Sequence, residues 1–389
     1  MPGWELIDNK EREALNDIFD KSNGVMFAHG FDERRNNIFR VREFEKKFAD
    51  RFGVKHCLAT TSGTMAQYIA MKAMGIGPGD EVITQAFTFV ATVETIIQLG
   101  ATPILIESDK TFNMDLDKLE EKINENTKLV IPVQMLGNQV DTDKLRSITS
   151  KYGIPIMEDA CEALGASFKN SMVGSHGDVG IFSLDFAKTI TTGEGGIIIT
   201  NDDEIAKYIR EFHDHGHESN SNVPRGKDTR SIMGLNLRMS ELQAAVGLAQ
   251  LEKLDYIVER NRHNKSLLKS LISNNGNIEF RKIVDENGDL ADTLIFYFKT
   301  SKEALDFVEK YNSFGYFTKN LPDAIDWHFA GTWNHMFIND KNYKDTWNSE
   351  WPITDNLLRR SISLPILVGH KDEDIIKQSE VINNILKSL

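Results

Sequence analysis

The stretch that decides the fold is PIMEDACEALGASFKNSMVGSHGDVGIFSLDFAKTITTGEGGIIIT, residues 155–200. It holds three short apolar runs separated by turn residues: PIMED (155–159), VGIFSL (179–184) and GIIIT (196–200). Short, nearly unbroken apolar runs are typical of strands that are covered on both faces. The stretch therefore predicts buried strands of a sheet that lies between helices.

The same alternation extends in both directions from this stretch. From residue 41 onward, amphipathic segments with helical spacing, such as VREFEKKFADRF and MAQYIAMKAMG, alternate with short apolar runs. This pattern predicts an α/β fold with a mixed, mostly parallel sheet covered by helices on both faces. The further predicted strands are HCLATT (56–61), EVIT (81–84), TPILI (102–106) and KLVIPV (128–133).

The carboxyl-terminal part has a different composition. Apolar residues three and four apart over 238–262 predict a long helix that could link two domains, and beyond residue 275 shorter strands such as LIFYFK (294–299) precede further helices. We therefore expect residues 1–264 to form an amino-terminal segment and a large domain. Residues 265–389 are expected to form a small α+β domain.

Charge and composition exclude several classes of binding partner. The formal net charge of −13 would repel phosphate backbones, which argues against nucleic acid as a partner. The two cysteines, Cys57 and Cys161, lack metal-site or disulfide-framework spacing. The amino terminus does not resemble a signal peptide, and no apolar run approaches the roughly 20 residues that cross a bilayer. We expect a cytoplasmic protein with no membrane partner and no metal.

Lys188 lies between the apolar run VGIFSL and a glycine-rich turn. One interpretation is a lysine at a strand end that extends its amine to solvent. The other is a desolvated, neutral amine that forms a Schiff base with an aldehyde. The segment alone does not decide between them.

Asp159 ends the run PIMED, 29 residues before Lys188. A buried acid at a strand end needs a cationic partner, and the protonated pyridine nitrogen of pyridoxal phosphate would be one. A helix cap or turn aspartate is the alternative interpretation. The pairing with Lys188 favours the cofactor.

Two weaker motifs accompany this pair. In TTSGTMA (60–66), backbone N–H groups of Gly63 and Thr64 at a helix start would suit a phosphate, although ordinary helix capping explains the motif equally well. In AFTFVATVET (86–95), the ring of Phe89 could lie against a flat cofactor, or simply pack in the core.

Several motifs in one order resemble the DegT/StrS-type sugar aminotransferases, a branch of the fold type I enzymes that use pyridoxal phosphate. The resemblance covers nearly the whole chain and is carried by VREFEKKFADRFGVKHCLATTSGT, GPGDEVITQAFTFVAT, PIMEDACEALGASF, GDVGIFSLDFAKTITTGEGG, GLNLRMSELQAAVGLAQLEKLD and SISLPIL. It implies that Lys188 is the Schiff-base lysine and that Asp159 pairs with the pyridine nitrogen. Lysine at 188, where a dehydratase branch has histidine, favours transamination with ping-pong kinetics and L-glutamate as amino donor.

The resemblance also implies the other cofactor ligands. Gly63, Thr64 and Ser183 match the phosphate ligands, and Phe89 matches the aromatic residue that stacks on the ring. Asn236, in GLNLRM, matches an asparagine that reaches the phosphate of a neighbouring subunit, which implies a homodimer with shared active sites.

Glu162 stands where many relatives have Gln or His near the phenolic oxygen of the cofactor. Two anionic oxygens in contact would repel each other. We therefore expect the pair to share a proton, which would raise the pKa of Glu162.

The segment 213–230 contains three alternating histidines, which would suit either a metal or, as a loop, polar contacts with a sugar. The segment 326–336, DWHFAGTWNHM, would suit sugar contacts, an interface or the core. Together with SLDFAKTITTGEGG, the first segment resembles the branch that makes 8-amino-3,8-dideoxy-octulosonate from a carboxylated keto sugar, whose carboxylate Arg225 or Arg230 could bind. The alternatives are an enzyme acting on a nucleotide-linked 4-keto hexose and a non-enzymatic regulator that binds the cofactor.

Overall fold

The computed structural model describes residues 3–220, 222–272, 276–337 and 349–389. Its central sheet has the order β3-β2-β4-β5-β8-β9-β1, in which parallel bridges from Val130 to Ile156 and from Val133 to Asp159 connect β4 with β5. Only β9 runs antiparallel to its neighbours, so the expected mixed, mostly parallel sheet is confirmed. The strands are β1 (His56–Thr60), β2 (Glu81–Gln85), β3 (Thr102–Ile106), β4 (Thr127–Val130), β5 (Met157–Asp159), β8 (Val179–Ser183) and β9 (Gly196–Thr200).

Four strands are shorter than the sequence predicts, β1 and β8 by one residue and β4 and β5 because of prolines. β4 stops before Pro132, and β5 begins after Pro155, because proline has no N–H to donate to a strand ladder. A small hairpin, β6 (Ser167–Phe168) with β7 (Ser171–Met172), follows β5. It lies in the loop between β5 and β8.

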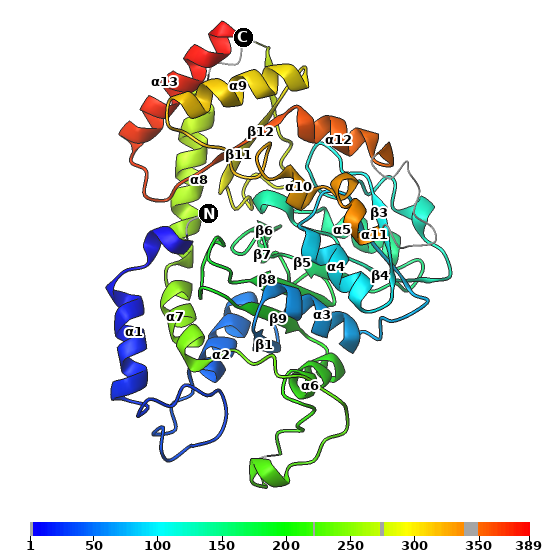
Figure 1. Ribbon diagram of the computed structural model, residues 1–389, viewed down its shortest axis with the longest axis vertical. Helices are drawn as coiled ribbons and strands as arrows, with labels where there is room; N and C mark the ends of the chain where they lie inside the picture. Colours follow the sequence, from blue (N-terminus) through cyan, green and yellow to red (C-terminus); the bar gives the residue numbers. More distant parts are fainter. Residues whose placement is uncertain (1–2, 221, 273–275, 338–348) are drawn as a thin grey trace.

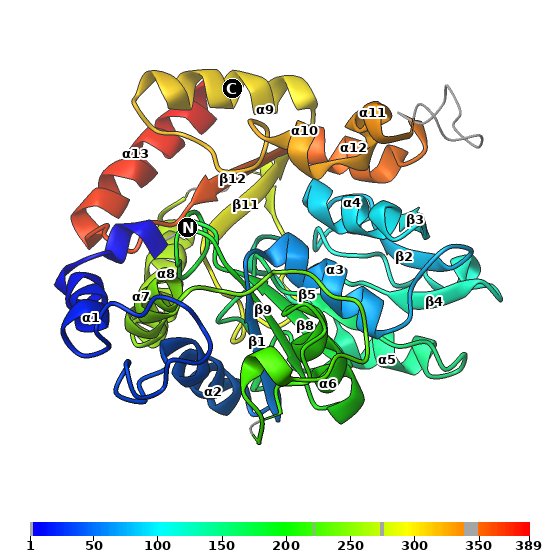
Figure 2. The same ribbon diagram turned by 60° about the horizontal axis from the view of Figure 1, so that its bottom comes forward.

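Helices cover both faces of the sheet, as Figures 1 and 2 show. Alternate residues of β9 belong to different cores: Ile198 packs in one apolar cluster, whereas Ile197 and Ile199 pack in another with Phe48. This alternation is what a strand buried on both faces requires. The helices of this part are α1 (Asn9–Asp20), α2 (Arg40–Phe52), α3 (Gly63–Ala73), α4 (Val90–Gln98), α5 (Thr142–Thr149) and α6 (Asp203–Phe212).

The predicted long helix over 238–262 is two helices, α7 (Glu241–Leu251) and α8 (Leu254–Leu271). The chain turns at Glu252 and Lys253, where the Lys253 ammonium reaches back to the carboxylate of Glu11 at 2.7 Å. This contact is between distant residues, so the periodicity of the segment does not reveal it. The predicted domain boundary after residue 264 falls inside α8 and stays a prediction.

The carboxyl-terminal part is built on an antiparallel sheet of β10 (Ile278–Phe280), β11 (Thr293–Phe298) and β12 (Ser361–Pro365). Its own apolar cluster includes residues of α8, α9 (Ser301–Ser313) and α13 (Asp372–Ser388). Between β11 and β12 the chain forms α10 (Ile325–His328), α11 (Asn334–Phe337) and α12 (Pro352–Arg359), which lie beside α4 and β3 in both views.

Several hydrogen bonds attach this segment to the large sheet and the loops after its strands. The N–H of Thr88 donates to the carbonyl of His328 at 2.9 Å, and the indole N–H of Trp351 donates to the carbonyl of Leu105 at 3.1 Å. They place α10 over the ends of the strands that carry the candidate site. Among the described residues, no helix is long and apolar enough to span a bilayer.

Candidate functional site

A cavity of about 310 Å³ lies where β5 and β8 end and α3 begins. The two strands bring Asp159 and Ser183 to one edge of the sheet, because carboxyl ends of parallel strands meet there. The predicted site residues that line this cavity are Gly63, Thr64, Phe89, Asp159, Glu162, Ser183 and Lys188. The structure therefore brings these seven predicted residues together, whereas Asn236 does not line the cavity.

Asp159 is almost completely buried and its carboxylate is held by three donors. Gln67 Nε2 and Thr92 Oγ1 donate to Oδ2 at 2.7 and 2.8 Å, and the N–H of Cys161 donates to Oδ1 at 3.2 Å. Burial nevertheless raises the pKa of Asp159, since the donors only partly offset the loss of water. The carboxylate is thus prepared for a cation that enters the cavity.

Lys188 extends into the same cavity, with its Nζ 3.7 Å from Glu162 Oε1. Burial acts to lower the pKa of Lys188, but the carboxylate of Glu162 and other acidic neighbours reverse the effect, so the pKa is raised. Of the two interpretations drawn from the sequence, the neutral amine is disfavoured by this raised pKa. The contact with Glu162 favours the protonated amine.

The pKa of Glu162 is lowered by the protein groups around it. Burial acts to raise it, but the Lys188 ammonium and His328 outweigh burial. The rise expected from the sequence concerns contact with the phenolic oxygen of the cofactor, so it stays a prediction. The N–H of Leu136 also donates to Glu162 Oε2 at 3.2 Å, from a backbone with φ of 51°, a strained value for leucine that is typical of functional sites.

Sequence reasoning did not single out four of the polar side chains at this site: Gln67, Thr92, Asn320 and His328. His328 Nε2 lies 3.7 Å from Glu162 Oε1 and 3.2 Å from the amide nitrogen of Asn320. The sequence signal for His328 is its place in DWHFAGTWNHM, a segment that would suit sugar contacts, an interface or the core. The structure places His328 of this segment at the site.

The start of α3 forms a phosphate-sized cradle. Ser62 caps the helix by accepting from the N–H of Met65, and the N–H groups of Gly63 and Thr64 donate to no protein group within the described residues. A Cβ at Gly63 would stand 2.9 Å from the Cβ of Ser183, so only glycine allows the helix to approach that strand. Free N–H groups at a helix start attract anions.

Phe89 caps the other side of the cavity. Its ring is 41% exposed rather than packed in the core, and it stacks on Trp327 with ring centroids 6.4 Å apart. An exposed flat ring at the mouth of a cavity can cover a planar ligand.

Asn236 and the 213–230 segment lie away from this cavity. Asn236 is exposed and pairs with Asp214 through a backbone bridge. Arg225, one of the two expected carboxylate partners, is already engaged in a two-pronged ion pair with Asp214, whereas Arg230 is exposed. The segment therefore does not contribute to the cavity of its own chain.

The histidines of that segment have separate environments. His213 is buried with Nδ1 on the carbonyl of Arg210, and His217 Nδ1 lies 3.4 Å from Asp228. Within the described ranges, no group of three or more His, Cys, Asp or Glu side chains is arranged to hold a metal.

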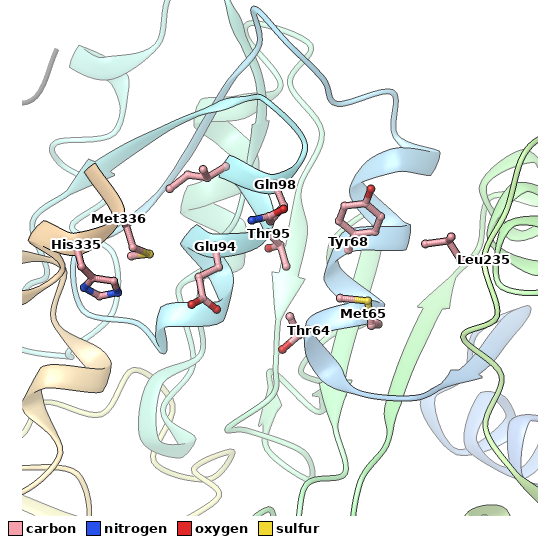
Figure 3. A pocket seen from close by; sticks show the side chains of 10 residues that line it. Thr64, Met65, Tyr68, Glu94, Thr95, Gln98, Leu235, His335 and Met336 are labelled. Carbon is pink, nitrogen blue, oxygen red and sulfur yellow. The ribbon is translucent and has the colours of Figure 1, made fainter. Parts of the chain in front are cut away.

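A larger pocket of about 650 Å³ adjoins the cavity at Thr64 (Figure 3). Tyr68 of α3, Glu94 and Gln98 of α4, and His335 of α11 line it. It contains neither Lys188 nor Asp159, so the smaller cavity is the one with the reactive groups. The larger pocket provides additional volume next to the smaller cavity.

The residues of the small cavity fit pyridoxal phosphate. The Lys188 amine matches the aldehyde of that cofactor, and the buried Asp159 carboxylate matches its ring nitrogen. The free N–H groups at the start of α3 match its phosphate. The cavity also has a ring that can cover a planar group.

Comparisons with known proteins agree with this chemistry. A model of the DegT/DnrJ/EryC1/StrS aminotransferase family matches residues 35–385. The chain is 32% identical over 356 residues to the spore coat polysaccharide biosynthesis protein SpsC of Bacillus subtilis, covering 90% of each chain. It is 44% identical over 224 residues to a GDP-perosamine synthase of Caulobacter vibrioides, a match that spans 57% of this chain and only 59% of that protein.

Solved structures are similar over the whole chain. A crystal structure of 3-amino-5-hydroxybenzoic acid synthase superposes with a TM-score of 0.85 at 26% identity, covering 100% of this chain and 99% of that one. A structure of ntda from Bacillus subtilis with bound cofactor PMP gives a TM-score of 0.83 at 26% identity, covering 98% of this chain and 83% of that one.

Proposed function

The chain belongs to the DegT/DnrJ/EryC1/StrS aminotransferase family, which makes it a pyridoxal-phosphate-dependent sugar aminotransferase, and we propose that Lys188 is the residue that holds the cofactor. The observation that carries the proposal is the convergence of the Lys188 amine, the Asp159 carboxylate and the free N–H groups of Gly63 and Thr64 on one cavity. Bound there, the cofactor supplies an electron sink for the carbon that loses its proton.

Asp159 is proposed to keep the ring nitrogen protonated. Its three donors fix the carboxylate in place, and a cation beside it would favour the ionised form that burial alone opposes. Gln67 and Thr92 position this acid.

Lys188 is proposed to move the proton during amino transfer. Its Nζ lies beside Glu162, so the carboxylate can stabilise the protonated amine after the lysine has taken a proton. Glu162 in turn is oriented by the N–H of Leu136 and by His328.

The phosphate is proposed to lie at the start of α3, against Gly63, Thr64 and Ser183, with Phe89 over the ring. Asn236 would complete this phosphate site from a second copy of the chain. What supports this is that Asn236 is exposed and does not line the cavity of its own chain. We therefore propose a homodimer with shared sites.

The proposed donor is L-glutamate, and the proposed acceptor is a free carboxylated keto sugar, the 8-oxo derivative of 3,8-dideoxy-octulosonate. The support for this acceptor is that the 213–230 segment resembles the family branch that makes 8-amino-3,8-dideoxy-octulosonate. A second candidate is a nucleotide-linked keto sugar, and the names of two relatives favour it: the GDP-perosamine synthase and a UDP-2-acetamido-2-deoxy-3-oxo-D-glucuronate aminotransferase of Pseudomonas aeruginosa, 40% identical over 253 residues, 64% of this chain and 67% of that one.

One experiment separates the two acceptors. Protein carrying the amino form of the cofactor is offered each keto sugar in turn, and the return of the absorbance of the aldehyde form is followed. Rapid return with the octulosonate alone supports the first candidate. Return with the nucleotide-linked sugar alone replaces it with the second.

A further inference from the structure

A third cavity, of about 190 Å³, lies between the start of α2 and the end of α6. It shares no lining residue with the cofactor cavity. Its charged and titratable lining residues are three arginines, Arg42, Arg210 and Arg238, two histidines, His29 and His213, and one acid, Glu45. The cavity is therefore rich in cationic groups, although the chain as a whole has a net charge of −13.

One buried aspartate beside the cavity forms ion pairs with two arginines. Asp214 accepts from both Arg225 and Arg238, so one negative charge faces two positive ones. His29 Nε2 lies 3.3 Å from the same carboxylate, yet this buried nitrogen has no hydrogen-bond partner. An unsatisfied buried donor or acceptor is costly unless a ligand or water reaches it.

The remaining acid does not balance the charge. Glu45 is engaged by Arg210 at 3.3 Å and by the N–H of Ala59 at 3.0 Å. Arg42 lies over the ring of Phe39 and has no ion pair among the described residues. Among the lining residues, three guanidinium groups therefore face one carboxylate, which leaves two positive charges in excess. Arg225 and Asp214, beside the cavity, offset each other.

The histidines do not add to this charge in the unliganded protein. Burial, together with nearby arginines and against the opposite effect of Asp214, lowers the pKa of His29 to about 4 and that of His213 to about 3. Both rings are neutral near pH 7 and offer ring nitrogens rather than charge. The arginines supply the positive potential.

We propose that this cavity binds a small oxyanion, the carboxylate or phosphate group of a small molecule. Guanidinium groups match both oxyanions through charge-assisted hydrogen bonds, and an enclosed site strengthens such bonds. Ala59 in this cavity and Ser62 in the cofactor cavity are three positions apart in the chain, so these two lining residues lie within about 10 Å of each other. The inference does not rest on the proposed function, since it concerns a different cavity.

The test is titration calorimetry on the cofactor-loaded protein, in which the phosphate of the cofactor already fills its own site. Inorganic phosphate and D-gluconate are the two probes, in a buffer free of other polyvalent anions. The expected result is saturable binding of at least one probe, weakened about tenfold or more in Arg42→Met and in Arg238→Met. Binding of phosphate alone or gluconate alone identifies the group that the site takes.

The matched control is Arg34→Met, which removes the same charge from an exposed arginine that does not line the cavity. Arg42 is exposed and has no ion pair among the described residues, so its variant is expected to fold even if loss of Arg238 from Asp214 is not tolerated. The proposal is overturned if neither probe binds at millimolar concentration. It is also overturned if Arg42→Met and Arg238→Met bind the probe as tightly as the parent protein and Arg34→Met do. If only Arg42→Met folds, tight binding by that variant alone overturns the proposal.

Discussion

Replacing Thr92 by valine removes one hydroxyl from the site and almost nothing else. Thr92 is fully buried, and its Oγ1 donates to Asp159 Oδ2 at 2.8 Å while it also lies 2.9 Å from the hydroxyl of Thr88. Valine keeps the volume and cannot donate. Because Thr92 is one of the groups that lower the pKa of Asp159 against burial, the variant raises that pKa further and disfavours the ionised acid.

The size of the effect follows from the bond that is lost. A hydrogen bond to a charged group contributes about 1.5–3 kcal/mol, which corresponds to roughly 10- to 100-fold in a dissociation constant. Gln67 and the N–H of Cys161 remain, so the carboxylate keeps its place. We expect Thr92→Val to bind pyridoxal phosphate roughly 10- to 100-fold more weakly, with the loss growing as the pH falls.

The assay titrates cofactor-free protein with pyridoxal phosphate and follows its absorbance. The matched control is Thr84→Val, a fully buried threonine whose hydroxyl donates to the neutral carbonyl of Ile131 at 2.8 Å. The control should lose some thermal stability and no cofactor affinity. If the two variants bind the cofactor equally well, Asp159 is not the group that holds the ring nitrogen.

Three further predictions test other parts of the site. Gly63→Ala should weaken cofactor binding because its Cβ meets the neighbouring strand. Gly77→Ala, whose Cβ has open space, should bind the cofactor normally. Equal cofactor affinity of the two variants in a calorimetric titration would show that the start of α3 does not hold the phosphate. In cofactor-free protein, Glu162→Gln should lower the pKa of Lys188, because the carboxylate that raises it against burial is gone, so the rate of cofactor uptake should reach its midpoint at a lower pH; an unchanged profile counts against the ion pair. Mixed dimers of Lys188→Ala and Asn236→Ala should be more active than either parent dimer, and activity no higher than the mean of the parents, with subunit exchange confirmed, would show that the sites are not shared.

The order of strands and helices could be predicted from local pattern alone. Apolar runs such as GIIIT and helical spacing such as VREFEKKFADRF each depend on neighbours in the chain, and the structure has β9 and α2 there. The turn between α7 and α8 could not be predicted, because Lys253 is held there by Glu11, more than 200 residues away. Local spacing carries no information about such a contact.

The same division applies to the site. Neither Lys188 nor Asp159 is decisive alone, but their pairing and the order of the surrounding motifs single them out in the sequence. Gln67 and Thr92 look like ordinary helix residues, and only the packing of α3 and α4 directs both onto Asp159. His328 reaches the cavity from the carboxyl-terminal part, and its effect on the pKa of Glu162 depends on a distance that no motif encodes.

The central claim is that Lys188 holds the cofactor, and chemical trapping tests it most directly. Protein loaded with pyridoxal phosphate is reduced with borohydride, digested and mapped by mass spectrometry. We predict a pyridoxyl group on the peptide that contains Lys188, and its absence in Lys188→Gln. A modified peptide from any other lysine, or none in protein shown to contain the cofactor, would contradict the account.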